Sequence, residues 1–210
     1  MQLELPAFDD VSVNEVFAEL PTPATVSIRG VPGSGKTIFA EHLIDASLAA
    51  GQANRVLLLG ETDADRKVLN QATGVGVELL SEIPSGRLAV EVLEDPAFRA
   101  VCHNVTHYPD VDTVVIDPID EIPGMDADHA DRLFTWLSAE VGVSVVTIGE
   151  TEVNGARSYA DLAVDFEQLS GAEDLWYADA VLSLDRPGTA TRETRAFRIE
   201  GYDIQMWEAT

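Results

Sequence analysis

Residues 30–37 restrict the folds open to this chain more than any other segment, and they read Gly30-Val31-Pro32-Gly33-Ser34-Gly35-Lys36-Thr37. They match the pattern G-x-x-x-x-G-K-[ST], in which glycines let the backbone curl until successive N–H groups point at phosphate oxygens. An apolar run precedes this loop at 24–29, and apolar residues at helical spacing follow it from 37 to 50. A strand, a phosphate-binding loop and a helix are therefore expected in that order, with the positive end of the helix facing the phosphate.

Two side chains of the 30–37 loop have expected chemical roles. Lys36 is expected to reach the β- and γ-phosphates of a nucleoside triphosphate, and the Thr37 hydroxyl to ligate Mg²⁺. The metal needs a second acid at the end of a neighbouring strand, and Asp117 follows the apolar run 112–116. Asp117 is the candidate for this role, with a helix cap or a turn as the structural alternative. The sequence contains no N-K-x-D pattern for guanine, so ATP is the expected nucleotide.

Strands and helices are expected to alternate through the middle of the chain. Apolar runs predict strands at the 55–59, 87–93, 112–116 and 143–148 segments, and helical patterns predict helices at 95–107 and 126–140. This alternation favours an α/β fold with a central, mostly parallel sheet that is flanked by helices on both faces.

The two ends of the chain differ from this middle part. Residues 1–23 form an acidic segment with a short amphipathic stretch that Pro21-Thr22-Pro23 stops, and residues 24–210 are expected to form one domain. After residue 170, short apolar runs at 178–184, 194–199 and 202–207 are separated by turn residues. They predict C-terminal antiparallel strands that close one end of the sheet.

The charge of the chain is strongly negative. Thirty-seven Asp and Glu face 13 Lys and Arg, which gives a formal net charge of −24, and the lysines are Lys36 and Lys67. At ordinary ionic strength this charge would repel itself, whereas at molar salt the screening length falls to about 3 Å. Acids spread along a lysine-poor chain indicate adaptation to a salt-rich (halophilic) cytoplasm. The alternative is a surface that repels nucleic acid or attracts basic partners.

Other features of the composition indicate where the protein acts. The apolar runs are far shorter than a membrane span, and the N-terminus lacks the features of an export signal. Cys102 is the single cysteine, which fits a reducing compartment. We therefore expect a cytoplasmic protein without a membrane partner.

Three segments resemble a known family in their order and spacing: residues 32–37, 55–62 and 114–117. The chain resembles P-loop ATPases of the RecA superfamily over residues 24–207, and among them the KaiC-like and archaeal RadA-like (RadB-type) members. The resemblance implies a RecA-like P-loop NTPase fold and a protein that uses ATP and Mg²⁺. It also implies that a glutamate ending the second strand activates the attacking water, and Glu61 occupies that position.

The residues themselves leave alternatives for these roles. An acid such as Glu61 that ends a strand parallel to the loop strand would face the γ-phosphate, but Glu121 and Glu150 also follow candidate strands at the same edge. In the family, a polar residue on a further core strand senses the γ-phosphate. Thr147 and Glu150 are the candidates for that role.

The sequence departs from the family pattern at two places. The glycine-rich segment before the loop strand is reduced to residues 20–23, Leu-Pro-Thr-Pro. In KaiC-like members, a Lys-x-Arg-Gly sequence contacts the ATP of the neighbouring subunit, and here the matching residues 198–201 read Arg-Ile-Glu-Gly. Glu200 would repel a γ-phosphate where an arginine would stabilise it. Whether the chain hydrolyses ATP or only senses it therefore stays open.

Three functions are compatible with these features. The first is a Mg²⁺-dependent ATPase or nucleotide-sensing switch that acts through self-association or a protein partner. The second is a recombination accessory protein that binds single-stranded DNA or a recombinase, for which a cluster of arginines is the only support: Arg186, Arg192, Arg195 and Arg198. Ion pairs with nearby acids are the structural alternative for this cluster. The third is a small-molecule phosphotransferase, which would need an arginine-rich lid where this chain has few arginines.

A zinc site is not expected. Cys102, His103 and His107 lie close together in the sequence, but they offer three ligands without a fourth.

Overall fold

The computed structural model describes residues 20–60, 77–107, 110–150, 160–168, 180–186, 191–200 and 203–208. The strands of this part are β1 (Thr25–Gly30), β2 (Asn54–Leu59), β3 (Leu88–Leu93), β4 (Thr113–Asp117), β5 (Ser144–Gly149), β6 (Leu162–Gln168), β7 (Ala180–Arg186), β8 (Thr191–Glu200) and β9 (Asp203–Glu208). The helices are α2 (Lys36–Ala49), α4 (Val77–Ser85), α5 (Phe98–Thr106) and α6 (Ala127–Thr135), with a 3₁₀ turn η1 (Ile119–Glu121) and a π-helical segment η2 (Trp136–Val141).

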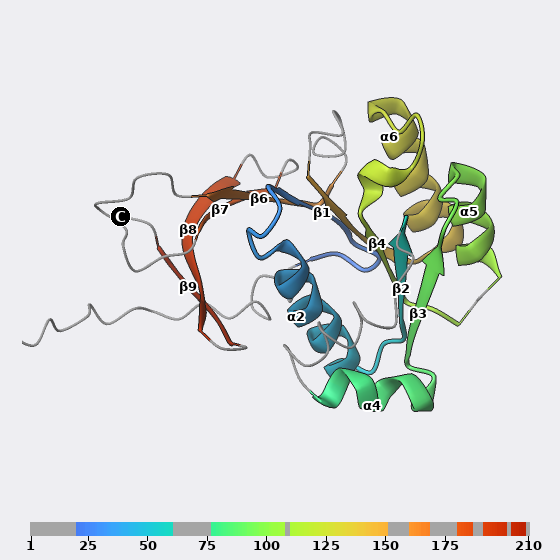
Figure 1. Ribbon diagram of the computed structural model, residues 1–210, viewed down its shortest axis with the longest axis horizontal. Coiled ribbons are helices and arrows are strands. Elements are labelled where there is room, and N and C mark those ends of the chain that lie inside the picture. Colours follow the sequence, from blue (N-terminus) through green and yellow to red (C-terminus); the bar gives the residue numbers. More distant parts are fainter. Residues whose placement is uncertain are drawn as a thin grey trace, which may run out of the picture.

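The strands form one nine-stranded sheet in the order β3-β2-β4-β5-β1-β6-β7-β8-β9. The neighbours from β3 to β6 are parallel, and the pairs β6–β7, β7–β8 and β8–β9 are antiparallel (Figure 1). The expected α/β fold, with a parallel centre and C-terminal antiparallel strands, is therefore confirmed.

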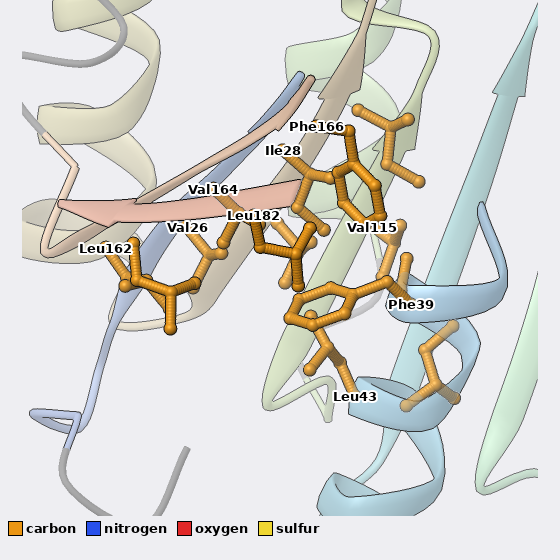
Figure 2. Packing of buried hydrophobic residues seen from close by; sticks show 14 of the residues in the cluster. Val26, Ile28, Phe39, Leu43, Val115, Leu162, Val164, Phe166 and Leu182 are labelled. Atoms are coloured by element: carbon orange, nitrogen blue, oxygen red, sulfur yellow. The ribbon is translucent and has the colours of Figure 1, made fainter. Parts of the chain in front are cut away.

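Helices cover both faces of the sheet, as the alternating pattern predicted. On one face α2 and α4 pack on a cluster that includes Val26, Ile28, Phe39 and Leu43 (Figure 2). On the other face α5, α6 and η2 pack on a second cluster of buried residues. Successive side chains of a strand point to opposite faces, so the buried strands of a parallel sheet read as continuous apolar runs.

The antiparallel strands extend the first of these two cores. Leu182 and Leu184 of β7 and Met206 of β9 are buried in the same cluster as the apolar side chains of α2. The C-terminal strands are thus packed as part of the domain, and they continue the sheet beyond β6 (Figure 1).

Several predicted elements differ in detail. The helix expected from residue 95 begins at Phe98, because Asp95 and Pro96 form a turn in which the Ala97 N–H donates to the Asp95 carbonyl. The helix expected at 126–140 is α6, capped by the Asp126 side chain, followed by η2, which ends at Val141 and is capped by Gly142 with φ 80°. The sequence patterns did not predict α4 or β6. Within the described residues, no helix is long and apolar enough to span a membrane.

Candidate phosphate-binding site

The 30–37 loop lies at the carboxyl end of the parallel strands, between β1 and α2. β1 ends at Gly30 and α2 begins at Lys36, so the loop has the predicted flanking elements. In open α/β sheets, ligands bind outside the carboxyl ends of the strands. No side chain hydrogen-bonds at the α2 cap, residue Gly35, so the start of this helix is not covered by a capping group.

Glycines shape the loop at three positions. Gly33 and Gly35 have φ values of 78° and 98°, a region that other residues rarely adopt. Gly30 is required for a different reason, because a Cβ there would lie 2.7 Å from both Phe166 Cβ and Ser34 Oγ. The loop thus lies tightly against β6 at Gly30, where a side chain would push it away, whereas side chains at Gly33 and Gly35 would strain the backbone.

Lys36 is held at this loop by its own backbone. The Nζ atom donates to the carbonyl oxygens of Gly30 at 2.7 Å and Val31 at 2.8 Å, and the residue is only 7% exposed. Burial lowers the pKa of the Lys36 ammonium, and carboxylates from three segments partly oppose this effect: Glu150, Asp117 and Asp120. The ammonium therefore lies where acids from the ends of β4 and β5 converge.

A second side chain of the loop fits an anion. The Ser34 hydroxyl is buried, and it has no hydrogen-bond partner within the part of the chain that the structure describes. Buried hydroxyls without a partner are uncommon, since they lose the hydrogen bonds that water would supply. A phosphate oxygen in the loop would satisfy the Ser34 hydroxyl, so the residues present fit a phosphate group.

Asp117 is the last residue of β4 and is 6% exposed. One expectation about it was wrong: β4 is not a neighbour of β1, because β5 lies between them. Sequence order does not determine strand order when each crossover helix can return on either side. Asp117 nevertheless lines the same cavity as Thr37, and its charge acts on Lys36.

The ends of β2, β4 and β5 come together at this edge. Glu61, the expected water-activating residue, lies outside the described residues. Glu121 reaches the end of β2, because a Cβ at Gly60 would lie 3.2 Å from its Oε2. Glu150 follows β5 directly, and its N–H donates to Asp120 Oδ2 at 2.5 Å. Both alternative glutamates are therefore at the edge of the sheet where the loop lies.

Thr147 lies deeper in the sheet than Glu150. It is 1% exposed and pairs with Ser27 of β1, and its hydroxyl is 3.5 Å from the Val26 carbonyl oxygen. Of the two candidates for sensing a γ-phosphate, Glu150 is the one at the open edge.

Glu41 is a residue of this site that the sequence patterns did not single out. It lies one helical turn after Thr37 and, together with Thr37 and Asp117, lines a cavity of about 60 Å³. Glu41 is 7% exposed, and burial, followed by the charge of Asp117, raises its pKa to about 8. The available signal was its spacing: Glu41 lies at helical intervals from Ile44 and Leu48, which are buried residues of the same helix.

The other side chains considered from the sequence do not join this edge. Arg195 of β8 forms an ion pair with Glu193 at 3.0 Å, which agrees with the structural alternative for the arginine cluster. Glu200 ends β8, but its side chain, like those of Arg186 and Arg192, lies outside the described part. His103 and His107 stack with ring centroids 4.4 Å apart. Among the described residues, no group of three or more His, Cys, Asp or Glu side chains is arranged to hold a metal ion.

Comparisons with protein-family models and with curated protein sequences found no match to this chain.

Proposed function

We propose that this protein binds ATP with Mg²⁺ at the 30–37 loop and acts as a RecA-like ATPase or nucleotide-sensing switch. The switch would control self-association or the binding of a protein partner. The order of the parallel core, the loop and the C-terminal antiparallel strands is compatible with the RecA-like fold that the sequence motifs suggest.

The observation that carries the proposal is the placement of Lys36. Its ammonium bonds to two carbonyl oxygens of a loop curled by glycines, at the start of α2. A buried cation at a helix N-terminus favours a multiply charged anion, and a loop of this type suits a polyphosphate. The unpartnered hydroxyl of Ser34 in the same loop supports an anion as the ligand.

The residues that would hold the metal are Thr37 and Asp117, which line one cavity from α2 and β4. Hydroxyl and carboxylate oxygens are the ligands that Mg²⁺ prefers in proteins. Bound there, Mg²⁺ would neutralise charge on the phosphates and polarise them. Lys36 would bind and orient the β- and γ-phosphates, and the backbone of residues Gly30, Val31, Pro32, Gly33, Ser34 and Gly35 would surround them.

Hydrolysis requires a base near the γ-phosphate, and the edge of the sheet offers more than one. Glu61 remains the proposed base, since in the sequence only Gly60 separates it from the end of β2. Glu121 and Glu150 are the described acids at the same edge. A chain in which none of these activates water would bind ATP and release it unchanged, which is the behaviour of a switch.

The test is ATP binding and turnover by the purified protein in molar KCl with Mg²⁺. Lys36→Ala is expected to abolish binding of a fluorescent ATP analogue, because the loop loses its cation. Arg132→Ala serves as the control, since it removes one positive charge from the exposed surface of α6. Turnover that is lost in Glu61→Gln but kept in Glu121→Gln and Glu150→Gln would identify an ATPase with Glu61 as the base.

Two other results separate the remaining cases. Binding that depends on Lys36 without any turnover identifies a nucleotide-sensing switch. If ATP with Mg²⁺ neither binds nor shifts the melting temperature of the wild-type protein, the proposal is wrong.

A further inference from the structure

Glu41 occupies a place in the core that packing does not explain. Its side chain faces a cavity whose walls are mostly aliphatic, among them Ile44, Leu58 and Val115. The residue is 7% exposed, so its carboxyl group is largely removed from water. A carboxyl group that is largely buried among aliphatic side chains loses much of the hydration it had in the unfolded chain, which is unfavourable for folding.

An aliphatic side chain would pack better at this position. Leucine or methionine would contact the same walls and would lose no hydration on burial. A carboxyl group in such a place therefore points to a ligand that is absent from the folded chain alone. The ligand must supply a positive charge or hydrogen-bond donors to the interior of the cavity.

The two other oxygen-bearing side chains of the cavity indicate what this ligand is. Thr37 and Asp117 line it together with Glu41, and these two residues are the ones that would hold Mg²⁺. Mg²⁺ demands six oxygens and usually keeps several water molecules in its shell. Those waters carry the hydrogen-bond donors that a carboxylate below the metal would accept.

We propose that Glu41 is a positioning residue for the metal, whose carboxylate accepts hydrogen bonds from the water molecules of the cation held by Thr37 and Asp117. This inference rests on the proposed function, since it concerns the cation that accompanies the nucleotide. It extends that function by making the affinity for the divalent cation depend on a side chain one turn inside α2.

The role predicts a split between metal binding and nucleotide binding. Glu41→Gln keeps the size of the side chain and removes its charge. Loss of such an outer partner of a metal shell lowers metal affinity by about 10-fold to 100-fold. Affinity for the nucleotide in EDTA is expected not to fall, because glutamine removes neither the loop nor Lys36, which would bind the phosphates.

The experiment measures both affinities on the full chain in molar KCl. Free Mn²⁺ is followed by electron paramagnetic resonance in the presence of a non-hydrolysable ATP analogue, and binding of a fluorescent ATP analogue is followed in EDTA. The matched control is Glu140→Gln, the same chemical change at an exposed position of η2. We expect weaker Mn²⁺ binding only in Glu41→Gln, with nucleotide binding in EDTA retained.

The possible results are distinct. If Mn²⁺ affinity of Glu41→Gln stays within about twofold of wild type while Lys36→Ala abolishes nucleotide binding, the inference about Glu41 is wrong and the proposed function stands. If the wild-type protein binds no nucleotide, both are wrong. Glu41→Met provides a second variant. A higher melting temperature without metal, together with weaker Mn²⁺ binding, supports the role of Glu41. A lower melting temperature with unchanged Mn²⁺ binding contradicts it.

Discussion

Glu41→Gln is expected to change how the stability of the metal-free protein depends on pH. In the folded chain the pKa of Glu41 is about 8, compared with an ordinary value of 4.5, because the carboxyl group is buried and lies near Asp117. Between these two values the unfolded chain has an ionised Glu41 while the folded chain keeps it protonated. Folding therefore takes up a proton, and Glu41 lowers the stability progressively as the pH rises through this window.

The size of the effect follows from the same two values. One pKa unit corresponds to about 1.4 kcal/mol, so the interval between pH 4.5 and pH 7 amounts to about 3 kcal/mol. The cost is absent below pH 4.5 and complete above pH 8. Glutamine cannot ionise, so the variant loses this pH-dependent cost. At pH 7 the difference would raise the melting temperature by roughly 6–12 °C in a chain of this length.

Denaturant titrations of both proteins between pH 5 and pH 8, in molar KCl with EDTA, measure the difference directly. Subtracting the two free energies of unfolding removes the contributions of the many other acids. Burying the amide of glutamine also lowers the free energy of unfolding, but by an amount that does not depend on pH. The test is therefore how the difference between the two free energies of unfolding changes with pH, and not its absolute value. A difference that is flat between pH 5 and pH 8, or that favours wild type as the pH rises, would refute the reasoning.

Two further predictions concern the packing around the site and the opposite face of the sheet. Gly30→Ala places a Cβ 2.7 Å from Phe166 Cβ and Ser34 Oγ. The substitution is expected to destabilise the fold by about 1–3 kcal/mol in urea titrations and to weaken ATP binding. Unchanged stability and binding would show that the loop is not held against β6. Asn104→Ala removes the side-chain oxygen that accepts a hydrogen bond from the buried Arg55 Nε at 2.7 Å. It is expected to lower the free energy of unfolding by about 1–3 kcal/mol. Thr106→Ala, on the exposed side of the same helix, is the control, and equal effects of the two substitutions would contradict this account.

The elements that the sequence predicted well are those whose burial is visible in the residue pattern. β4 and β5 are buried on both faces, so they read as largely apolar runs between polar turns. The 30–37 loop is predictable because its conformation depends on glycines, whose positions are local information.

β6 was not predicted because the contacts that stabilise it involve residues far away in the sequence. Its apolar residues alternate with acids, and one of these, Asp165, is held by Arg29 of β1 in an ion pair of 2.5 Å. The two residues are register partners on neighbouring strands, far apart in sequence. α4 was missed as well, since Pro84 lies inside it and breaks the usual helical pattern.

The strand order and the phase of α2 were also beyond the sequence patterns. An apolar run is enough to predict that Asp117 ends a strand. The position of β5 between that strand and β1 depends on how the crossover helices pack, which the run does not show. An acid on a helix is normally expected to face solvent, because ionised side chains are rarely buried. Glu41 faces the cavity instead, because the start of α2 is fixed by the loop and this sets which side of the helix meets β4.

The charges at this edge explain why a cation is central to the proposed function. The carboxylates of Glu150, Asp117 and Asp120 all act on the single ammonium of Lys36, and Glu41 adds a further carboxyl group beneath them. The phosphates of ATP would bring more negative charge into the same place, within a chain whose net charge is already −24. Lys36 alone does not balance these groups, so a polyphosphate would bind strongly only together with a divalent cation that the acids attract. On this account the acids that weaken binding of the free nucleotide are the groups that make the site selective for its metal complex.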